Sequence, residues 1–222
     1  MAFPNSRSAP PTAVVFDAYG TLLSNPSPAR PFAQLKEMMA CQGLDVSDFA
    51  HRAMTGRHTL SSLAASYGAS FPLQTLARLD AQLMAELMVI RPYPEAERTI
   101  RHVLSRGAVV VVASNLAWPY ALPVQAALDT VASRLASIPG SVSRVRTAFS
   151  FDLGTVKPSR EFYQAVLDSL AADGVEPSRM FMVGDRQVED VDGPRAAGWS
   201  AWRVNRSKDE GLLDAPWDRW LG

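Results

Sequence analysis

Five short apolar runs stand out along the chain because they lack any alternation of apolar and polar positions. The strongest reads AVVVVA and spans residues 108–113. Continuous apolar runs of this length are typical of strands covered on both faces, as in a parallel sheet. We therefore predict strands at Thr12–Phe16, Ala108–Ala113, Thr147–Phe151, Met180–Val183 and Ser200–Val204.

Helical patterns lie between these predicted strands. They cover Glu95–Arg106, Val124–Ile138 and a segment that Ser159 can cap and that closes near Gly174. Ser, Thr, Asp and Asn are preferred caps, and glycine often ends a helix. The alternation of strand and helix predicts an α/β fold with a doubly wound parallel sheet of about five strands.

The stretch from Leu23 to about Arg91 breaks this alternation, because it contains no convincing strand. It carries four helical runs, at Pro31–Leu44, Val46–Thr55, Leu60–Tyr67 and Leu73–Ile90. We predict a helical unit at 24–91, inserted directly after the first strand, within a core made of 12–23 and 92–222. Residues 1–11, rich in proline, serine and alanine, are predicted to be a disordered tail.

Composition narrows the class of protein. The 22 basic and 22 acidic residues balance, so nothing predicts bulk attraction to nucleic acid or to an anionic membrane. Cys41 is the sole cysteine, which excludes an intrachain disulfide, and we expect it to be at least half-buried in its helix. No apolar run approaches a membrane span, and the N-terminus lacks a secretory signal pattern. We expect a soluble, cytoplasmic protein; the sequence does not predict its oligomeric state.

Polar residues follow the first two predicted strands of the core. Asp17 comes directly after the first strand, and Gly20 then permits a sharp turn. This places a carboxylate at the carboxyl edge of the sheet, where open α/β sheets bind ligands. Thr21 is expected to donate its hydroxyl to that carboxylate and keep it ionised. Ser114 and Asn115 end the second strand and bring short neutral donors to the same edge.

Two later motifs complete the set. Lys157 precedes Pro158 in a loop ahead of the Ser159 cap, from which it can reach the sheet edge. The strand Met180–Val183 leads through a glycine to Asp185 and Asp190. Each motif alone is weak, since aspartates after strands are often turn residues and loop lysines are often solvated.

The ordered set is far more specific than its parts. Strand–Asp–x–x–Gly–Thr, strand–Ser–Asn, Lys–Pro and strand–Gly–Asp–x4–Asp together resemble the haloacid dehalogenase superfamily of hydrolases, over residues 12–206. The helical insertion resembles the small α-helical (C1-type) cap of that family. The resemblance implies a Rossmann-like core with strand order 3-2-1-4-5. It also implies that Asp17 attacks the substrate and forms an aspartyl intermediate that water hydrolyses.

The resemblance assigns further roles. Ser114 would hold an oxygen of the transferred group, and Lys157 would neutralise charge on the nucleophile and the intermediate. Asp185 and Asp190 match the fourth motif. Tyr19 occupies the position where phosphatases of the family usually carry a second aspartate, so FDAYGTL looks like a dehalogenase motif, whereas GDRQVED looks like a phosphatase motif.

Electrostatics bears on the choice between phosphatase and dehalogenase activity. Asp17, Asp185 and Asp190 are expected to converge, and Lys157 can offset only one of their charges. Like charges at close range disfavour joint ionisation unless a cation intervenes. Mg²⁺ is the natural partner, held by Asp17, Asp185 and the backbone carbonyl of Tyr19. We therefore favour Mg²⁺-dependent hydrolysis of a phosphate monoester of a small, anionic metabolite.

Two other hypotheses stay open. A metal-independent 2-haloacid dehalogenase would account for Tyr19 and would need a cap arginine, for which Arg30, Arg52 and Arg57 are available. A non-catalytic binding protein on the same scaffold would account for the missing second aspartate. Within the phosphatase hypothesis, the Tyr19 hydroxyl has an ordinary pKa of about 10, which suits acid catalysis poorly. That predicts a preference for leaving groups that are weak bases.

Overall fold

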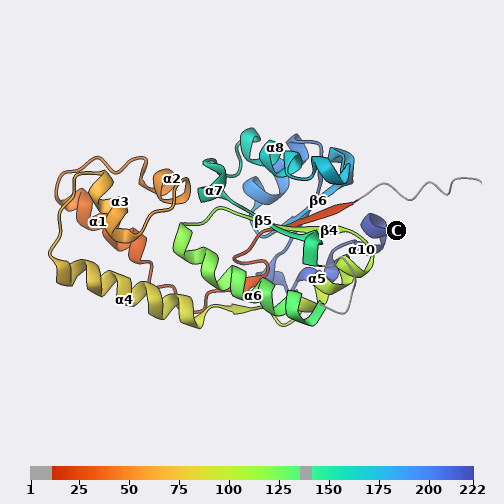
Figure 1. Cartoon of the computed structure of the whole chain (residues 1–222), viewed down its shortest axis with the longest axis horizontal. Coiled ribbons are helices and arrows are strands. Elements are labelled where there is room, and N and C mark those ends of the chain that lie inside the picture. The colour runs from red at the N-terminus through yellow and green to blue at the C-terminus, as the bar shows by residue number, and fades with distance from the viewer. Residues whose placement is uncertain (1–11, 136–141) are drawn as a thin grey trace, which may run out of the picture.

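The core of the protein is a five-stranded parallel sheet with helices on both faces (Figure 1). The computed structural model describes residues 12–135 and 142–222. The strands of the sheet are β1 (Ala13–Phe16), β4 (Val109–Ser114), β5 (Val145–Phe149), β6 (Met180–Gly184) and β7 (Ser200–Arg203). Their order is β5-β4-β1-β6-β7, with parallel neighbours throughout. Counted along the chain this is 3-2-1-4-5, so the predicted doubly wound α/β fold is confirmed.

Alternate residues of the central strand face opposite sides of the sheet, as strand geometry requires. Val14 and Phe16 pack on the side of α5 (Ala96–Ser105), α6 (Ala121–Leu135) and α10 (Trp217–Leu221). Ala13 and Val15 pack on the side of α8 (Arg160–Asp168). Figure 1 shows α8 on one side of the strands and α5 and α6 on the other. Both faces of the central strands are therefore dry, which explains the unbroken apolar runs.

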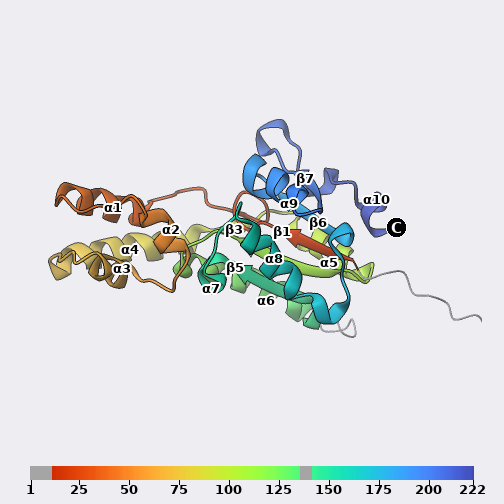
Figure 2. The same cartoon turned by 90° about the horizontal axis from the view of Figure 1, so that it is seen from above.

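The four helices that lie between Leu23–Ser24 and Arg91–Pro92 in the chain gather at one end of the molecule, away from the sheet, in both views (Figures 1 and 2). Their interior is built largely from buried leucines, such as Leu35, Leu63 and Leu79. The helices are α1 (Pro31–Cys41), α2 (Phe49–Met54), α3 (Leu60–Ser66) and α4 (Leu73–Val89). The boundaries of the predicted inserted unit, 24–91, stay a prediction.

Two short strands join the chain segments that enter and leave these helices. β2 (Leu23–Ser24) pairs antiparallel with β3 (Arg91–Pro92), and the N–H of Tyr93 donates to the carbonyl of Leu22 at 2.9 Å. The expectation of no strand between Leu23 and Arg91 was wrong at these two ends. A strand of two residues has no periodicity, so the sequence pattern does not reveal it.

Other elements differ from their predicted bounds. β5 runs over Val145–Phe149 rather than Thr147–Phe151, and Ser150 begins a short helix, α7 (Ser150–Leu153). Because β5 is an edge strand, its Arg146 can reach an ion pair with Asp173 and need not be apolar. The helix capped by Ser159 ends at Asp168, and a separate 3₁₀ turn, Ala171–Asp173, continues to Gly174.

Cys41 is exposed, so the prediction that it is at least half-buried was wrong. The buried stripe of α1 passes through Leu35 and Met39, and Cys41 lies two residues off that stripe. The predicted tail 1–11 and residues 136–138 of the predicted helix Val124–Ile138 lie outside the described residues. Within the described ranges, no helix has both the length and the apolar character that crossing a bilayer demands.

Candidate active site

The sheet topology brings three of the four sequence motifs to one edge. β1 lies between β4 and β6, with Phe16 in register with Val112 and Val183. The next residue after β1 is Asp17, the last residue of β4 is Ser114, and the residue after β6 is Asp185. Because all three strands are parallel, their carboxyl ends meet, as predicted for ligand sites in this class of fold.

Lys157 joins two aspartates at the centre of this edge. Its Nζ lies 2.7 Å from Asp17 Oδ1 and 2.6 Å from Asp190 Oδ1, and it also donates to the carbonyl of Ala113 at 3.1 Å. Lys157, Asp17 and Asp190 are all buried. A buried lysine is tolerable only when such partners compensate its lost hydration. The loop lysine is therefore an internal counter-ion rather than a solvated surface charge.

Ser114 and Asn115 hold this arrangement from the end of β4. The Ser114 hydroxyl donates to Asp17 Oδ1 at 3.0 Å. The Asn115 amide donates to the backbone carbonyl of Lys157 at 2.7 Å, and its Oδ1 accepts the Lys157 N–H at 2.8 Å. Asn115 thus fixes the lysine loop to the sheet edge. Both bonds to Asp17 fall on Oδ1, and within the described ranges no side chain or backbone group donates to Oδ2, which leaves that oxygen available as a nucleophile.

Burial shapes the titration of the site. Loss of hydration raises the pKa of the Asp17 carboxyl to about 6, against the opposing effect of Lys157 and with a further rise from Asp190. Burial also raises the pKa of Asp185, and the charge of Asp190 adds to that rise. Burial alone would lower the pKa of Lys157, but its two aspartates outweigh this and raise it. The positive charge of Lys157 therefore does not fully compensate the negative charges of Asp17, Asp185 and Asp190.

The three aspartates could hold a metal ion. One carboxylate oxygen from each of Asp17, Asp185 and Asp190 lies within 4.8 Å of the others. Asp185 Oδ1 is buried and has no hydrogen-bond partner among the described residues, an unusual state for a carboxylate oxygen. A set of hard oxygen donors with excess negative charge suits Mg²⁺. The residues present therefore fit the ion that the sequence predicts, and the Tyr19 carbonyl stays a predicted third ligand.

Glycine at position 20 makes room for this cluster. The turn places Gly20 at φ 84°, a conformation that favours glycine, and an added Cβ would lie 2.5 Å from Asp185 Oδ2. The same turn directs Thr21 away from its expected partner. Thr21 is buried, yet its hydroxyl has no hydrogen-bond partner among the described residues. The prediction that Thr21 donates to Asp17 was therefore wrong.

Tyr19 does not point its hydroxyl into the acidic cluster. The hydroxyl donates to the backbone carbonyl of Tyr120 at 2.7 Å, and the two rings meet edge to face with centroids 6.0 Å apart. Burial, together with the charge of Glu86, raises the pKa of Tyr19 far above its ordinary value. A phenol that is both committed as a donor and held protonated is a poor acid catalyst near neutral pH.

Glu86 on α4 is a functional candidate that the sequence analysis missed. It is buried and accepts three hydrogen bonds, from the Asn25 amide at 2.7 Å, the Arg30 N–H at 3.0 Å and the Tyr120 hydroxyl at 3.1 Å. One carboxylate therefore ties α4 to the start of α1 and to the sheet side of the molecule. An acidic residue on the buried face marked by Leu79 and Leu83 was the available signal.

A second missed feature lies after β6. Residues Gln187–Asp192 form a π-helical turn, a rare geometry that is frequent at functional sites. The Tyr163 hydroxyl donates to the carbonyl of Glu189 at 2.6 Å, and Gly184 leaves room for Asp190, whose Cγ would lie 2.3 Å from an added Cβ. The turn folds Asp190 back toward Lys157.

A pocket of about 470 Å³ opens beside the reaction centre. Tyr19 and Asn115 line it from the sheet edge, and α1 and α2 contribute the opposite wall. None of Arg30, Arg52 and Arg57, the arginines available to a dehalogenase, is among the described residues that line it. Arg52 pairs with Asp48, and Arg57 pairs with Asp152, both on exposed surface.

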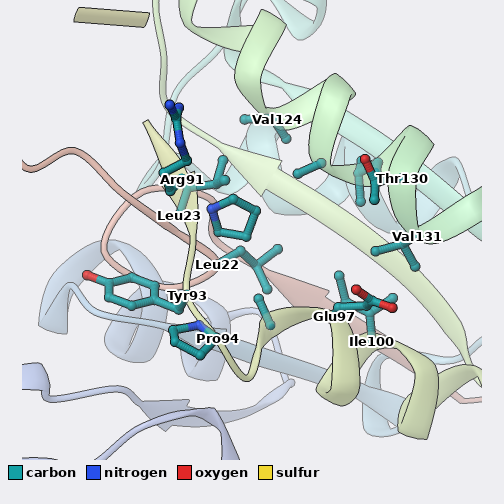
Figure 3. Close-up of a pocket in the computed structure, with 14 residues that line it drawn as sticks. Leu22, Leu23, Arg91, Tyr93, Pro94, Glu97, Ile100, Val124, Thr130 and Val131 are labelled. Carbon is teal, nitrogen blue, oxygen red and sulfur yellow. The ribbon is translucent and has the colours of Figure 1, made fainter. Parts of the chain in front are cut away.

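Another pocket, of about 340 Å³, lies against the β2–β3 pair and between α5 and α6 (Figure 3). Figure 3 shows Leu22 and Leu23 facing this space together with Val124 and Val131 of α6. Among the described residues that line it, none belongs to the acidic cluster or its hydrogen-bond partners. The pocket next to Tyr19, by contrast, includes Tyr19 and Asn115 from the sheet edge.

Comparison with known proteins places this chain in a family. Solved structures with the same fold include a HAD phosphatase from Thermococcus onnurineus, at 19% identity over 90% of this chain and 89% of that chain, with a TM-score of 0.52. An L-2-haloacid dehalogenase from Xanthobacter autotrophicus, with chloropropionic acid covalently bound, is 19% identical over 93% and 84% (TM-score 0.50). A HAD family enzyme from Bacteroides thetaiotaomicron, in complex with magnesium and inorganic phosphate, is 13% identical over 88% and 94% (TM-score 0.55). At such identities these likenesses establish the fold alone.

The family model described as haloacid dehalogenase-like hydrolase matches residues 11–198. The chain therefore belongs to the haloacid dehalogenase-like hydrolases, and it is a hydrolase. No curated protein matches the chain. Both phosphatases and dehalogenases share the fold, so the family does not decide between these two activities.

Proposed function

We propose that this chain is a Mg²⁺-dependent phosphatase that hydrolyses phosphate monoesters of a small metabolite through an aspartyl-phosphate at Asp17. The observation that carries the proposal is the surplus of carboxylates. Asp17, Asp185 and Asp190 approach one another, Lys157 is the only cation paired with them among the described residues, and one buried oxygen of Asp185 has no partner there. Hydrolysis of a haloacid does not require a cluster of carboxylates. Hydrolysis of a phosphate with Mg²⁺ does, because the carboxylates bind the metal ion.

The residues then divide the reaction between them. Oδ2 of Asp17 attacks phosphorus while the bond from phosphorus to the ester oxygen breaks. Water next cleaves the aspartyl-phosphate, which releases inorganic phosphate and restores the carboxylate. Lys157 stabilises charge on the Asp17 side, and Ser114 is placed to bind a phosphoryl oxygen. Bound Mg²⁺, held by Asp17, Asp185 and the Tyr19 carbonyl, would supply the positive charge that lets an anionic phosphate approach an anionic nucleophile.

The leaving group receives little help in this scheme. The Tyr19 hydroxyl already donates to Tyr120, and Asp190 is paired with Lys157. The substrate should therefore carry a leaving group that is a weak base, such as the phenolate of an aryl phosphate or the carboxylate of an acyl phosphate. Oxygens of low basicity depart without a proton in the transition state.

The second candidate function is metal-independent 2-haloacid dehalogenation. Tyr19 favours it, because a halide leaves as a stable anion and needs no acid, and the Xanthobacter structure shows that the fold supports that chemistry. The positions of Arg52 and Arg57 outside the pocket weigh against it. The third hypothesis, a non-catalytic binding protein, is set aside because the chain belongs to a hydrolase family and retains Asp17, Ser114, Lys157 and Asp185.

One panel separates the two activities. The purified protein is incubated with aryl phosphates of graded leaving-group pKa and with 2-chloropropionate, each with EDTA and with Mg²⁺. We expect phosphate release that EDTA abolishes and Mg²⁺ restores, rising steeply as leaving-group pKa falls, and no chloride release. Tyr19→Phe should keep phenyl phosphate kcat within about threefold, because the residue is not the acid. Chloride release that is indifferent to EDTA would replace the phosphatase with a dehalogenase.

A further inference from the structure

The pocket beside the reaction centre carries one formal charge. Among the described residues that line it, Lys36 is the only charged side chain, and no acid is present. Lys36 lies four residues after Phe32 on α1, so both project from the same face of that helix and both line the pocket. The remaining wall is largely apolar or aromatic, with Phe49, Met54 and Tyr120 as its larger members.

Lys36 has no counter-ion. Within 12–135 and 142–222, no acid forms an ion pair with its ammonium group and no group accepts a hydrogen bond from it, although the residue is half-buried. An anion that enters the pocket can form a charge-assisted hydrogen bond with this ammonium group, and such a bond is stronger beside apolar walls than in open solvent. The pocket therefore favours a ligand that is apolar along its body and negatively charged where it meets Lys36.

The neighbouring polar groups do not compete for that role. Asn25 also lines the pocket, but its amide already donates to Glu86, at 2.7 Å. Asn115 lines it as well, with its amide donated to the carbonyl of Lys157. Each amide uses one of its two N–H donors in this way, and Asn25 Oδ1 is buried without a partner among the described residues, so the asparagines can add neutral contacts while Lys36 is the charged donor among the described lining residues.

The wall that carries Lys36 is also held in place. Glu86 accepts from the N–H of Arg30, the residue immediately before α1, and from the hydroxyl of Tyr120 on the opposite wall. One buried carboxylate therefore fixes the start of the helix that bears Lys36 relative to the sheet side of the pocket. Such preorganisation lowers the cost of ordering the site when a ligand binds.

We propose that this pocket binds the organic part of the substrate and that Lys36 pairs with a second anionic group on it, so that the preferred substrates are phosphate esters with an apolar body ending in an anion such as a carboxylate. The proposal rests on the proposed phosphatase function and adds its substrate class. The reacting phosphate occupies the acidic edge with Ser114 and Lys157, and the body extends past Tyr19 and Tyr120 toward α1.

The test compares phenyl phosphate with its 3-carboxy and 4-carboxy derivatives. We expect at least one carboxylated ester to show a KM about tenfold lower, since a charge-assisted contact is worth about a factor of ten or more. Lys36→Met should remove that preference, measured as the ratio of kcat/KM for the carboxylated ester to kcat/KM for phenyl phosphate within the same variant. Lys208→Met, at an exposed lysine outside this pocket, is the matched control and should leave that ratio unchanged. Lys36→Glu should shift the preference to 4-(aminomethyl)phenyl phosphate, a result that a misfolded variant cannot give.

The outcomes separate the two proposals. Turnover of phenyl phosphate with no gain from either carboxylate, or an equal gain in Lys36→Met, overturns the role of Lys36 and leaves the phosphatase intact. If the wild-type protein hydrolyses no phosphate ester, the phosphatase proposal fails. Calorimetric binding of 4-carboxybenzylphosphonate against benzylphosphonate then still decides on Lys36: preference lost in Lys36→Met supports the pairing, and equal binding by both proteins rejects it.

Discussion

Replacing the nucleophile should stabilise the metal-free protein. Burial raises the pKa of Asp17 from its ordinary value of 3.8 to about 6, so the native protein keeps this proton to a higher pH than the unfolded chain does. As pH rises from about 4 to about 6 the unfolded chain loses the proton first, and native stability falls. The difference corresponds to about 3 kcal/mol, at 1.36 kcal/mol for each pKa unit. Asp17→Asn, which cannot ionise, should escape that loss.

The assay is urea unfolding of both proteins in EDTA, at pH 8 and at pH 3.5. At pH 8 the variant should unfold with a free energy up to about 3 kcal/mol higher, and at pH 3.5, where Asp17 is largely protonated in both states, the gain should fall to a few tenths of a kcal/mol. The isosteric amide can still accept from Ser114 and Lys157. Asp80→Asn, at an exposed position of α4, should change neither value. A variant no more stable than wild type at pH 8, or equally favoured at both pH values, would refute the reasoning.

Two further substitutions probe the walls of the site. Gly20→Ala and Gly68→Ala both impose a side chain on a positive φ, of 84° and 71°, and should each cost about 1 kcal/mol in unfolding free energy. Only Gly20→Ala also displaces Asp185, so it alone should lower kcat/KM with Mg²⁺, by about tenfold or more; equal kcat/KM in the two variants would contradict the proposed metal site. Glu86→Gln replaces an acceptor of three hydrogen bonds with a group that also donates, so it should lose about 2 kcal/mol in urea unfolding and raise KM more than it lowers kcat. If that variant had the stability and KM of the wild type, the hydrogen bonds of Glu86 would contribute neither to stability nor to substrate binding.

The fold was largely predictable from the sequence because both faces of the central strands are buried. An unbroken apolar run such as Val109–Ala113 has few alternatives to a central parallel strand, and the strand order followed from the family resemblance. Elements at the periphery were less predictable. β5 tolerates Arg146 because it is an edge strand, and β2 and β3 are too short to carry a pattern. Such elements depend on contacts with residues far away in the sequence, which a short stretch of sequence does not reveal.

The acidic centre was predictable for a related reason. Once the parallel strands are fixed, the residues at their carboxyl ends must meet, so the proximity of Asp17, Ser114 and Asp185 follows from the topology. The direction of a hydroxyl group does not follow from the topology, because it depends on the backbone conformation of the turn that carries the side chain. Thr21 is the example, since the turn at Gly20 leaves its hydroxyl without the expected bond. Glu86 was missed because its three donors come from segments 34 to 61 residues away in the chain.

The pairing of β2 with β3 has a mechanical consequence. Two segments of the chain connect the sheet to α1–α4. They pair with each other through β2 (Leu23–Ser24) and β3 (Arg91–Pro92), so they form one two-stranded ribbon. This ribbon is one of several connections between the four helices and the core, because Glu86 of α4 accepts from the Tyr120 hydroxyl and Arg57 pairs with Asp152 of α7. The pocket next to Leu22 borders the β2–β3 pair (Figure 3). A displacement of α1 or α2 would therefore change the pocket next to Tyr19, which Phe32 and Phe49 line, whereas none of the described residues that line the pocket next to Leu22 belongs to α1–α4.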